Sequence, residues 1–398
     1  METFNMGRSF RLNIAAISCF NVKNDPVLRG FSKLFGRNIE KSIEGWSQIV
    51  GALAVSGRNL GEYFKNMLIF SNSPTAQKIA GNPTGFGREA LKNDLRILRS
   101  IVEQDPVDIE TGLMDFYNTK DFDFSKLPLY DSGNFSFTVD DYIDFVRRSG
   151  SGIFAKYKAF SFNGELIPIE HPDPIRLGDL KNYEAQRERI IANTRCFLAD
   201  KPAQNVLLYG DRGTGKSATV KAILNEYDAL RMVEVLKNNI DKLPNLFEKL
   251  KGIPLHFIVA IDDLSFSEND DRFGILKAVL EGSLSAKPAN VLIYATTNRR
   301  KIIRETLADR EISGSDAIDE SMSLTDRFGL FITFTKPDKR VYLDIVSRLA
   351  EDRNINISAE ELSAGAESFA LRHGGRSPRA ARQYVDYLYG KLSLDSVR

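Results

Sequence analysis

Eight consecutive residues near the middle of the chain have the types and spacing of a phosphate-binding loop. They read Gly-Asp-Arg-Gly-Thr-Gly-Lys-Ser and satisfy the pattern G-x-x-x-x-G-K-[ST] at every fixed position. In such a loop the glycines allow successive backbone N–H groups to turn toward phosphate oxygens, and the helix that follows adds its positive N-terminal end. We therefore expect a nucleoside triphosphate to be bound by Gly210, Asp211, Arg212, Gly213, Thr214, Gly215, Lys216 and Ser217.

Magnesium chemistry is expected beside this loop. Lys216 has the position of the lysine that reaches the β- and γ-phosphates, and Ser217 that of the hydroxyl that ligates Mg²⁺. A second apolar stretch, Phe257 to Ile261, ends in Asp262 and Asp263. We interpret Asp262 as the carboxylate that holds Mg²⁺ through water, and Asp263 as the base that orients and deprotonates the attacking water. An apolar run that ends in aspartate is common by itself, so this interpretation depends on the loop upstream.

The region that begins with this loop resembles the AAA+ ATPases, whose substrate is ATP. The apolar stretch Val291 to Ala295 is followed by Thr-Thr-Asn, which is similar to the sensor 1 motif, and the resemblance implies that Asn298 contacts the γ-phosphate or the water. It also implies that Arg327, in Leu-Thr-Asp-Arg-Phe, is an arginine finger that completes the site of a neighbouring subunit. Arg379, in Gly-Arg-Ser-Pro-Arg, has the place of sensor 2 and would reach the γ-phosphate.

Five phrases are similar to one bacterial AAA+ family, known as domain of unknown function 815, over roughly residues 150 to 390. That membership indicates an ATPase without naming a substrate. The phrases are Pro172 to Leu177, Gly210 to Ser217, Asp262 to Phe266, Tyr294 to Arg300 and Asp326 to Leu330.

The second acidic position departs from the usual AAA+ pattern. Most members have Asp-Glu there, whereas this chain has Asp262-Asp263. Because aspartate is one methylene shorter, its carboxylate stands about 1.5 Å further from the water, and geometric misplacement costs rate steeply. Replication initiators and transposon helper ATPases of the superfamily also carry Asp-Asp. We therefore expect slow, partner-stimulated hydrolysis.

The elements that must position these residues are five short apolar segments separated by helical patterns. This alternation predicts an α/β fold with a parallel five-stranded P-loop sheet and helices on both faces. A helical lid is expected after the sheet and a helical domain before it. The predicted strands are Asn205 to Tyr209, Arg231 to Val235, Phe257 to Ile261, Val291 to Ala295 and Leu330 to Phe334.

Upstream of the sheet, Phe154 to Ile169 alternates around Asn163-Gly164 and predicts a β-hairpin. Apolar residues at helical spacing over Ile39 to Ile69 and Gly87 to Glu103 predict helices before it. The predicted domains are a mostly helical region 1–150, a hairpin and linker 151–171, the AAA+ ATPase domain 172–336 and the lid 337–398.

Composition narrows the class of protein. The 54 Lys+Arg and 53 Asp+Glu leave a formal charge of +1, so nucleic acid is not indicated strongly as a partner. Two cysteines and three scattered histidines argue against a disulfide scaffold and against histidine-rich metal chemistry. No stretch approaches 18 consecutive apolar residues, so we expect a cytoplasmic protein that does not span a membrane.

The expected function is binding and hydrolysis of Mg-ATP by a homo-oligomer that remodels or loads an unidentified client protein. The alternative is a slowly hydrolysing switch or scaffold of the helicase-loader type, which binds protein or DNA. Threading of polypeptide is disfavoured because Lys237 to Gly252 lacks an aromatic-hydrophobic-glycine loop. A GTPase is disfavoured because no Asn-Lys-x-Asp motif is present.

Overall fold

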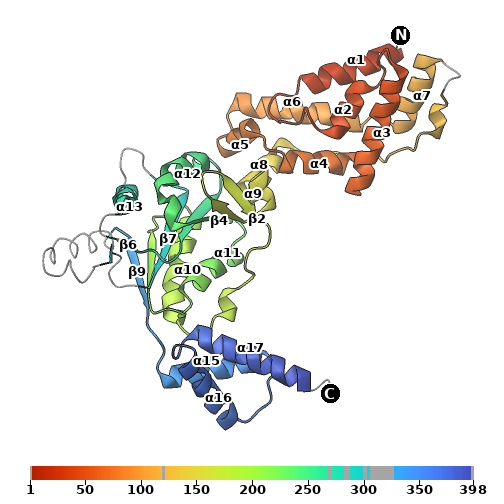
Figure 1. The fold of residues 1–398 in the computed structure, drawn as a ribbon. Coiled ribbons are helices and arrows are strands. Elements are labelled where there is room, and N and C mark those ends of the chain that lie inside the picture. The colour runs from red at the N-terminus through yellow and green to blue at the C-terminus, as the bar shows by residue number, and fades with distance from the viewer. Residues whose placement is uncertain are drawn as a thin grey trace. The chain divides into compact units, whose positions relative to one another are not determined.

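The computed structural model describes residues 2–118, 122–267, 270–281, 287–298, 303–304 and 327–395 (Figure 1). Of the phrases noted above, Arg299, Arg300 and Asp326 lie outside these residues. The chain forms two compact units. One comprises Met1–Tyr157 with Gly252–Leu255, and the other comprises Lys158–Lys251 with His256–Arg398.

The first unit is helical and surrounds a core that includes the fully buried Trp46 and Phe64. The periodicity over Ile39 to Ile69 corresponds to two helices, because Gly57 adopts a left-handed φ of 63° and ends the first of them. The helices are α1 (Glu2–Ala15), α2 (Pro26–Lys33), α3 (Ile39–Ser56), α4 (Leu60–Phe70), α5 (Pro74–Gly81), α6 (Gly85–Val102), α7 (Pro106–Tyr117), α8 (Val139–Ser149) and α9 (Ile153–Lys156).

The second unit is built on a seven-stranded sheet with the order β2-β1-β4-β5-β7-β3-β9. All neighbouring strands are parallel except β1 and β2, which are antiparallel. The strands are β1 (Ala159–Phe162), β2 (Leu166–Ile169), β3 (Val206–Gly210), β4 (Leu230–Val235), β5 (His256–Ile261), β7 (Val291–Thr297) and β9 (Leu330–Phe334). A separate pair consists of β6 (Phe266–Ser267) and β8 (Ile303–Arg304).

The prediction of five strands, all parallel, was therefore wrong in its count. All five predicted segments are strands, but the hairpin β1–β2 extends the same sheet, with β1 parallel to β4. This pairing satisfies backbone groups at an edge that β4 would otherwise expose. The hairpin is also shorter than expected, since Ile153–Lys156 at its start is helical.

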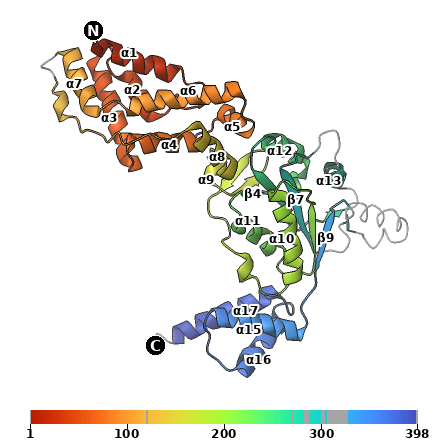
Figure 2. The same ribbon diagram turned by 180° about the vertical axis from the view of Figure 1, so that it is seen from behind.

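Helices cover both faces of the sheet, and the phosphate-binding loop follows the carboxyl end of the inner strand β3. All seven positions of β7 are buried, which requires cover on both faces. Helices α10 (Glu184–Leu198) and α11 (Lys216–Glu226) are labelled in Figure 2. Their buried side chains share a core with one of these faces. The helices α12 (Leu243–Leu250) and α13 (Asp271–Glu281) lie in the connections that follow β4 and β5.

The C-terminal residues form three helices with a core of their own, shown in blue in Figures 1 and 2. They are α15 (Lys339–Asp352), α16 (Ala359–Arg372) and α17 (Pro378–Asp395). Tyr342 is fully buried there, and its hydroxyl donates to the Ala366 carbonyl at 3.0 Å. No helix among the residues that the structure describes is long and apolar enough to span a membrane.

Candidate nucleotide-binding site

The loop between β3 and α11 has the backbone that its glycines were expected to supply. Gly210, Gly213 and Gly215 have φ values of 142°, 78° and 94°, which side chains rarely allow. A Cβ on Gly210 would lie 1.8 Å from the carbonyl oxygen of Phe334. The loop is therefore a curled segment held tightly against the end of β9.

Lys216 is the first residue of α11 and is almost fully buried within this curl. Its ammonium donates to the carbonyls of Gly210 and Asp211, both at 2.8 Å, and to Oδ1 of Asn298 at 2.9 Å. Burial lowers the pKa of Lys216, and the negative charges of Asp211, Asp262 and Asp263 oppose this shift. The ammonium lies where its charge can meet phosphate oxygens bound by the loop.

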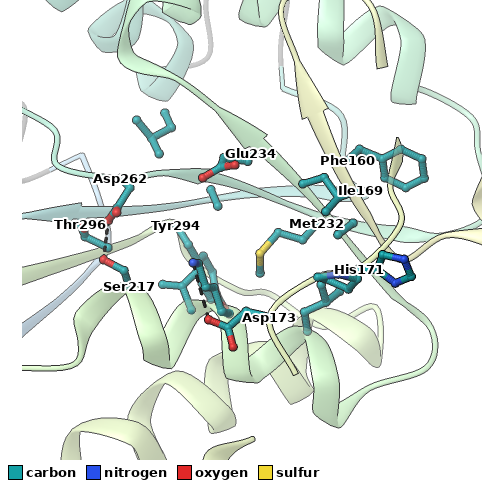
Figure 3. Close-up of a pocket in the computed structure, with 17 residues that line it drawn as sticks. Phe160, Ile169, His171, Asp173, Ser217, Met232, Glu234, Asp262, Tyr294 and Thr296 are labelled. Carbon is teal, nitrogen blue, oxygen red and sulfur yellow. Dashed lines mark hydrogen bonds and ion pairs between the residues drawn. The ribbon is translucent and has the colours of Figure 1, made fainter. Parts of the chain in front are cut away.

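A cluster of oxygen atoms lies beside the lysine. The Ser217 hydroxyl donates to Oδ1 of Asp262 at 2.6 Å, and the Thr296 hydroxyl donates to the same oxygen (Figure 3). Thr296 also accepts the backbone N–H of Asp263 at 3.1 Å. Hydroxyl and carboxylate oxygens are the ligands that Mg²⁺ prefers, and the side chains of Ser217 and Asp262 therefore fit a magnesium site.

Asp263 and Asn298 complete a continuous polar chain. The side-chain amide of Asn298 donates to Oδ1 of Asp263 at 2.8 Å, while its oxygen accepts from Lys216. Asp263 has a left-handed φ of 50°, a backbone conformation that is uncommon in non-glycine residues. Strands β5 and β7 are paired in register up to Ile261 and Ala295, so the residues that follow each strand meet at one edge.

Arg379 lies at the same cleft, but Arg327 does not. A cleft of about 580 Å³ is lined by the loop, both aspartates, Asn298 and Arg379. The backbone N–H of Arg379 donates to the Gly213 carbonyl at 3.1 Å, which brings the start of α17 to the loop. Arg327 is outside this lining, and its guanidinium forms an ion pair with Glu281 of the same chain.

Some predicted loop residues support the site rather than line it. Asp211 accepts the backbone N–H of Lys336 at 3.0 Å, and the Thr214 hydroxyl donates to the Asp211 carbonyl at 2.8 Å. Neither side chain, nor Gly210, lines the cleft, whereas Arg212 does.

Sequence reasoning missed several residues that line the cleft. They include Ile175, Leu180, Pro378 and Arg382, and the last of these donates to the Asp179 carbonyl at 2.7 Å. Ile175 stands in one of the phrases that resemble the family, but the pattern alone gave it no role. These residues come from segments far apart in the sequence, so only the fold brings them together.

Residues 153–392 match the model of a family described as a protein of unknown function, DUF815. The chain belongs to this family. The resemblance drawn from the sequence phrases is therefore confirmed.

Curated relatives extend the comparison beyond the DUF815 family. The chain is 24% identical over 261 residues to a proteasome-activating nucleotidase of Methanocaldococcus jannaschii, covering 56% of this chain and 57% of that protein. It is 30% identical over 186 residues to a cell division cycle protein 48 homolog of Archaeoglobus fulgidus, covering 41% of this chain and 23% of that one. The chain thus spans about half the length of the first relative and less of the second. With the family match, these relatives support membership of the AAA+ superfamily and an ATPase-type function.

Among solved structures, the chain is similar to the RuvB Holliday junction branch migration motor of Thermotoga maritima, with 15% identity and a TM-score of 0.39. The match covers 56% of this chain and 67% of that chain.

Proposed function

We propose that this DUF815 chain binds Mg-ATP in the 580 Å³ cleft and hydrolyses it, and that this cycle remodels or loads a partner protein. The observation that carries the proposal is the connected network of side chains at the loop. Lys216, Asn298 and Asp263 form one hydrogen-bonded chain, and Ser217 and Asp262 form a pair beside it. The ammonium that would bind phosphate, the oxygens that would bind a metal ion and the carboxylate that would orient a water molecule thus lie next to one another.

The proposed roles follow from these contacts. The loop N–H groups and Lys216 hold the phosphates. Ser217 and Asp262 would hold Mg²⁺, which when bound neutralises charge on the β- and γ-phosphate oxygens. Asp263 orients the attacking water and accepts its proton, and Asn298 fixes the direction of that carboxylate through its 2.8 Å hydrogen bond.

Two arginines would complete the charge stabilisation. Arg379 would reach the γ-phosphate from the C-terminal helices, and residues 337–398 would then act as a lid over the ATPase domain 172–336. The backbone hydrogen bond from Arg379 to Gly213 supports this proposal. Arg327 would act on the nucleotide of a neighbouring subunit in a homo-oligomer, because it does not line the cleft of its own chain. Residues 1–150 would then be free to bind the client.

A slowly hydrolysing switch remains the second candidate, and Asp263 is the observation that favours it. The shorter carboxylate lowers the rate of water activation while leaving the phosphate contacts of Lys216 intact. In that case, ATP binding and not turnover would set the conformation that loads a partner onto DNA. A rate that rises severalfold with a client, with repeated rounds of work, distinguishes the motor from the switch.

Equilibrium binding of a fluorescent ATP analogue tests the site. Lys216→Ala removes the buried ammonium, so affinity should fall at least about a hundredfold, the effect of losing a charge-assisted contact in a buried site. Lys201→Ala is the matched control, because this exposed lysine lies between α10 and β3 and lines neither the cleft nor the face of α11. Its affinity should stay within about twofold. Unchanged affinity in folded Lys216→Ala protein would overturn the assignment.

A further inference from the structure

A second cavity lies on the other side of the Ser217–Asp262 pair, between α11 and the sheet (Figure 3). Its volume is about 250 Å³. It shares four lining residues with the nucleotide cleft, namely Asp173, Ser217, Asp262 and Thr296. Its other lining residues do not include the loop or the arginines. Nothing in the proposed ATPase cycle uses this space.

The register of the strands explains why the cavity exists. Ala159 of β1 is paired with Met232 of β4, and Ala260 of β5 lies between Glu234 and Tyr294 in the adjoining row. The two alanines present only a methyl group to the face that α11 covers, whereas larger side chains surround them. The helix therefore stands above a hollow at these positions.

The roof and the outer wall come from two further segments. Ser217, Val220, Lys221 and Leu224 line the roof and follow the spacing of one helix face. His171, Pro172 and Asp173, which follow β2, close the outer side. Most of the enclosed surface is apolar, so an occupant needs an apolar body.

The charges in the cavity are mainly negative. Asp262 already accepts two hydroxyl hydrogen bonds, and Asp173 forms an ion pair of 3.8 Å with Lys221. Glu234 is different: its side chain is exposed although it stands inside the sheet, and no hydrogen bond or ion pair of its carboxylate occurs among the residues that the structure describes. A cation is the group that this carboxylate would accept.

We propose that this cavity binds a small amphipathic amine, with an apolar body of roughly ten to fifteen non-hydrogen atoms and an ammonium group directed at Glu234. The body would lie over Ala159 and Ala260 beneath the apolar residues of α11. Because the far end of the cavity is formed by Ser217 and Asp262, the amine would act as an effector of Mg-ATP binding. This second part rests on the proposed function.

Ligand-observed NMR titration of the full chain without nucleotide tests the binding directly. The probes are 3-phenylpropylamine, 3-phenylpropan-1-ol and 3-phenylpropionate, which share one body and differ in charge. The amine should bind at least about tenfold more tightly than the carboxylate, with the alcohol between them, because Glu234 attracts the ammonium group and repels a carboxylate. Equal affinity of all three, or tighter binding of the carboxylate, would overturn the proposal.

Substitutions at three lining residues locate the site. Ala260→Leu fills the hollow and should abolish binding of the amine, and Ala159→Val is the smaller change to use if the first protein does not fold. Glu234→Gln should make the amine and the alcohol bind equally, because it removes the charge and keeps the shape. If a folded variant with the filled cavity binds the amine with the affinity of the wild-type protein, the amine binds elsewhere and the proposal fails.

Titration of the ATP analogue with and without the amine separates the two claims. A severalfold change in ATP-analogue affinity that is lost in Ala260→Leu supports the effector role, since coupling between two sites is reciprocal. If the amine binds and the affinity for the analogue does not change, the effector role is wrong. If the amine binds but no nucleotide does, the proposed function fails while the cavity assignment stands.

Discussion

The hydroxyl group of Thr296 connects Asp262 and Asp263, the two adjacent aspartates of the candidate site. It donates to Oδ1 of Asp262 and accepts the backbone N–H of Asp263. The hydroxyl therefore holds the Asp262 carboxylate, which we propose binds the metal, and the backbone of Asp263, which we propose carries the catalytic carboxylate. The sequence placed Thr296 in a sensor-like phrase, but its role depends on hydrogen bonds that only the paired strands β5 and β7 allow.

Replacing this hydroxyl should weaken catalysis while leaving in place every residue to which we assign a contact with phosphate or Mg²⁺. Thr296→Val keeps the shape and loses both hydrogen bonds, so we expect hydrolysis to fall about 10- to 100-fold and to need more magnesium, as is typical when a supporting partner of a metal ligand is lost. Thr296→Ser keeps the hydroxyl and should restore most of the rate. The rate of phosphate release, measured as a function of magnesium concentration, reports both effects. Equal titration curves for Thr296→Val and the wild-type protein would show that the hydroxyl contributes to neither magnesium binding nor hydrolysis.

At the scale of elements, the site depends on a junction between β3, β9 and the C-terminal helices. The backbone N–H of Asp211 donates to the Phe334 carbonyl at 3.1 Å, next to the close approach of Gly210. The side chain of the same aspartate accepts from Lys336, and Arg379 reaches Gly213. The loop is therefore linked by hydrogen bonds to the end of β9, to the segment that leads into α15 and to the start of α17.

A methyl group at this junction should be costly. Gly210→Ala places a Cβ against the Phe334 carbonyl in a backbone conformation that disfavours alanine, so we expect a loss of roughly 2 to 4 kcal/mol in the free energy of unfolding. Gly274→Ala is the matched control, because this glycine lies within α13 and has no atom within 4 Å of an added Cβ. It should gain up to about 1 kcal/mol. Denaturant unfolding measures both, and equal stability of the two variants would contradict the account.

The strands and the loop could be predicted because each has a local signal. Apolar runs mark the five strands, and G-x-x-x-x-G-K-S marks the loop. The pairing of the hairpin with β4 could not be predicted. Alternation of apolar residues predicts a hairpin, but the backbone groups that pair one strand with the next are the same in every sequence. The pattern therefore does not indicate which strand of the sheet the hairpin will join. For the same reason the hollow over Ala159 and Ala260 follows from strand register and not from either residue alone.

At the scale of the whole molecule, the open question is where Arg327 acts. Its ion pair with Glu281 holds the guanidinium at the end of α13, away from the cleft of its own chain. A planar, permanently charged fork suits the charge that spreads over transferring phosphoryl oxygens. We infer that assembly brings Arg327 to the γ-phosphate of a neighbouring subunit.

Mixing two inactive variants tests shared sites. Arg327→Ala should bind ATP almost normally but hydrolyse poorly, since an arginine finger is worth roughly 10³- to 10⁵-fold in rate. The Lys216→Ala protein should not bind ATP in its own cleft, but it still carries Arg327 for the cleft of a neighbouring subunit. A mixture should therefore regain part of the phosphate release, because some interfaces combine an intact cleft with an intact arginine.

A second mixture is the control for this experiment. Lys216→Ala and Asp263→Asn both damage their own clefts, so their mixture should remain inactive. If the first mixture also stays inactive while each variant assembles with wild type, Arg327 serves only as a partner of Glu281 within its own chain, and the switch alternative gains.

The most direct test of the account compares phosphate release from saturating Mg-ATP by the wild-type protein and by Asp263→Asn. Asparagine keeps the hydrogen bond with Asn298 within reach but cannot accept a proton from water. We predict an affinity for the ATP analogue within a few-fold of wild type and hydrolysis lower by about a hundredfold or more, the usual contribution of a general base. Asp271→Asn is the matched control, because Asp271 is an exposed residue at the start of α13, and it should hydrolyse at the wild-type rate. Equal turnover by Asp263→Asn and the wild-type protein would contradict the assignment of this cleft as the site of ATP hydrolysis through Asp263.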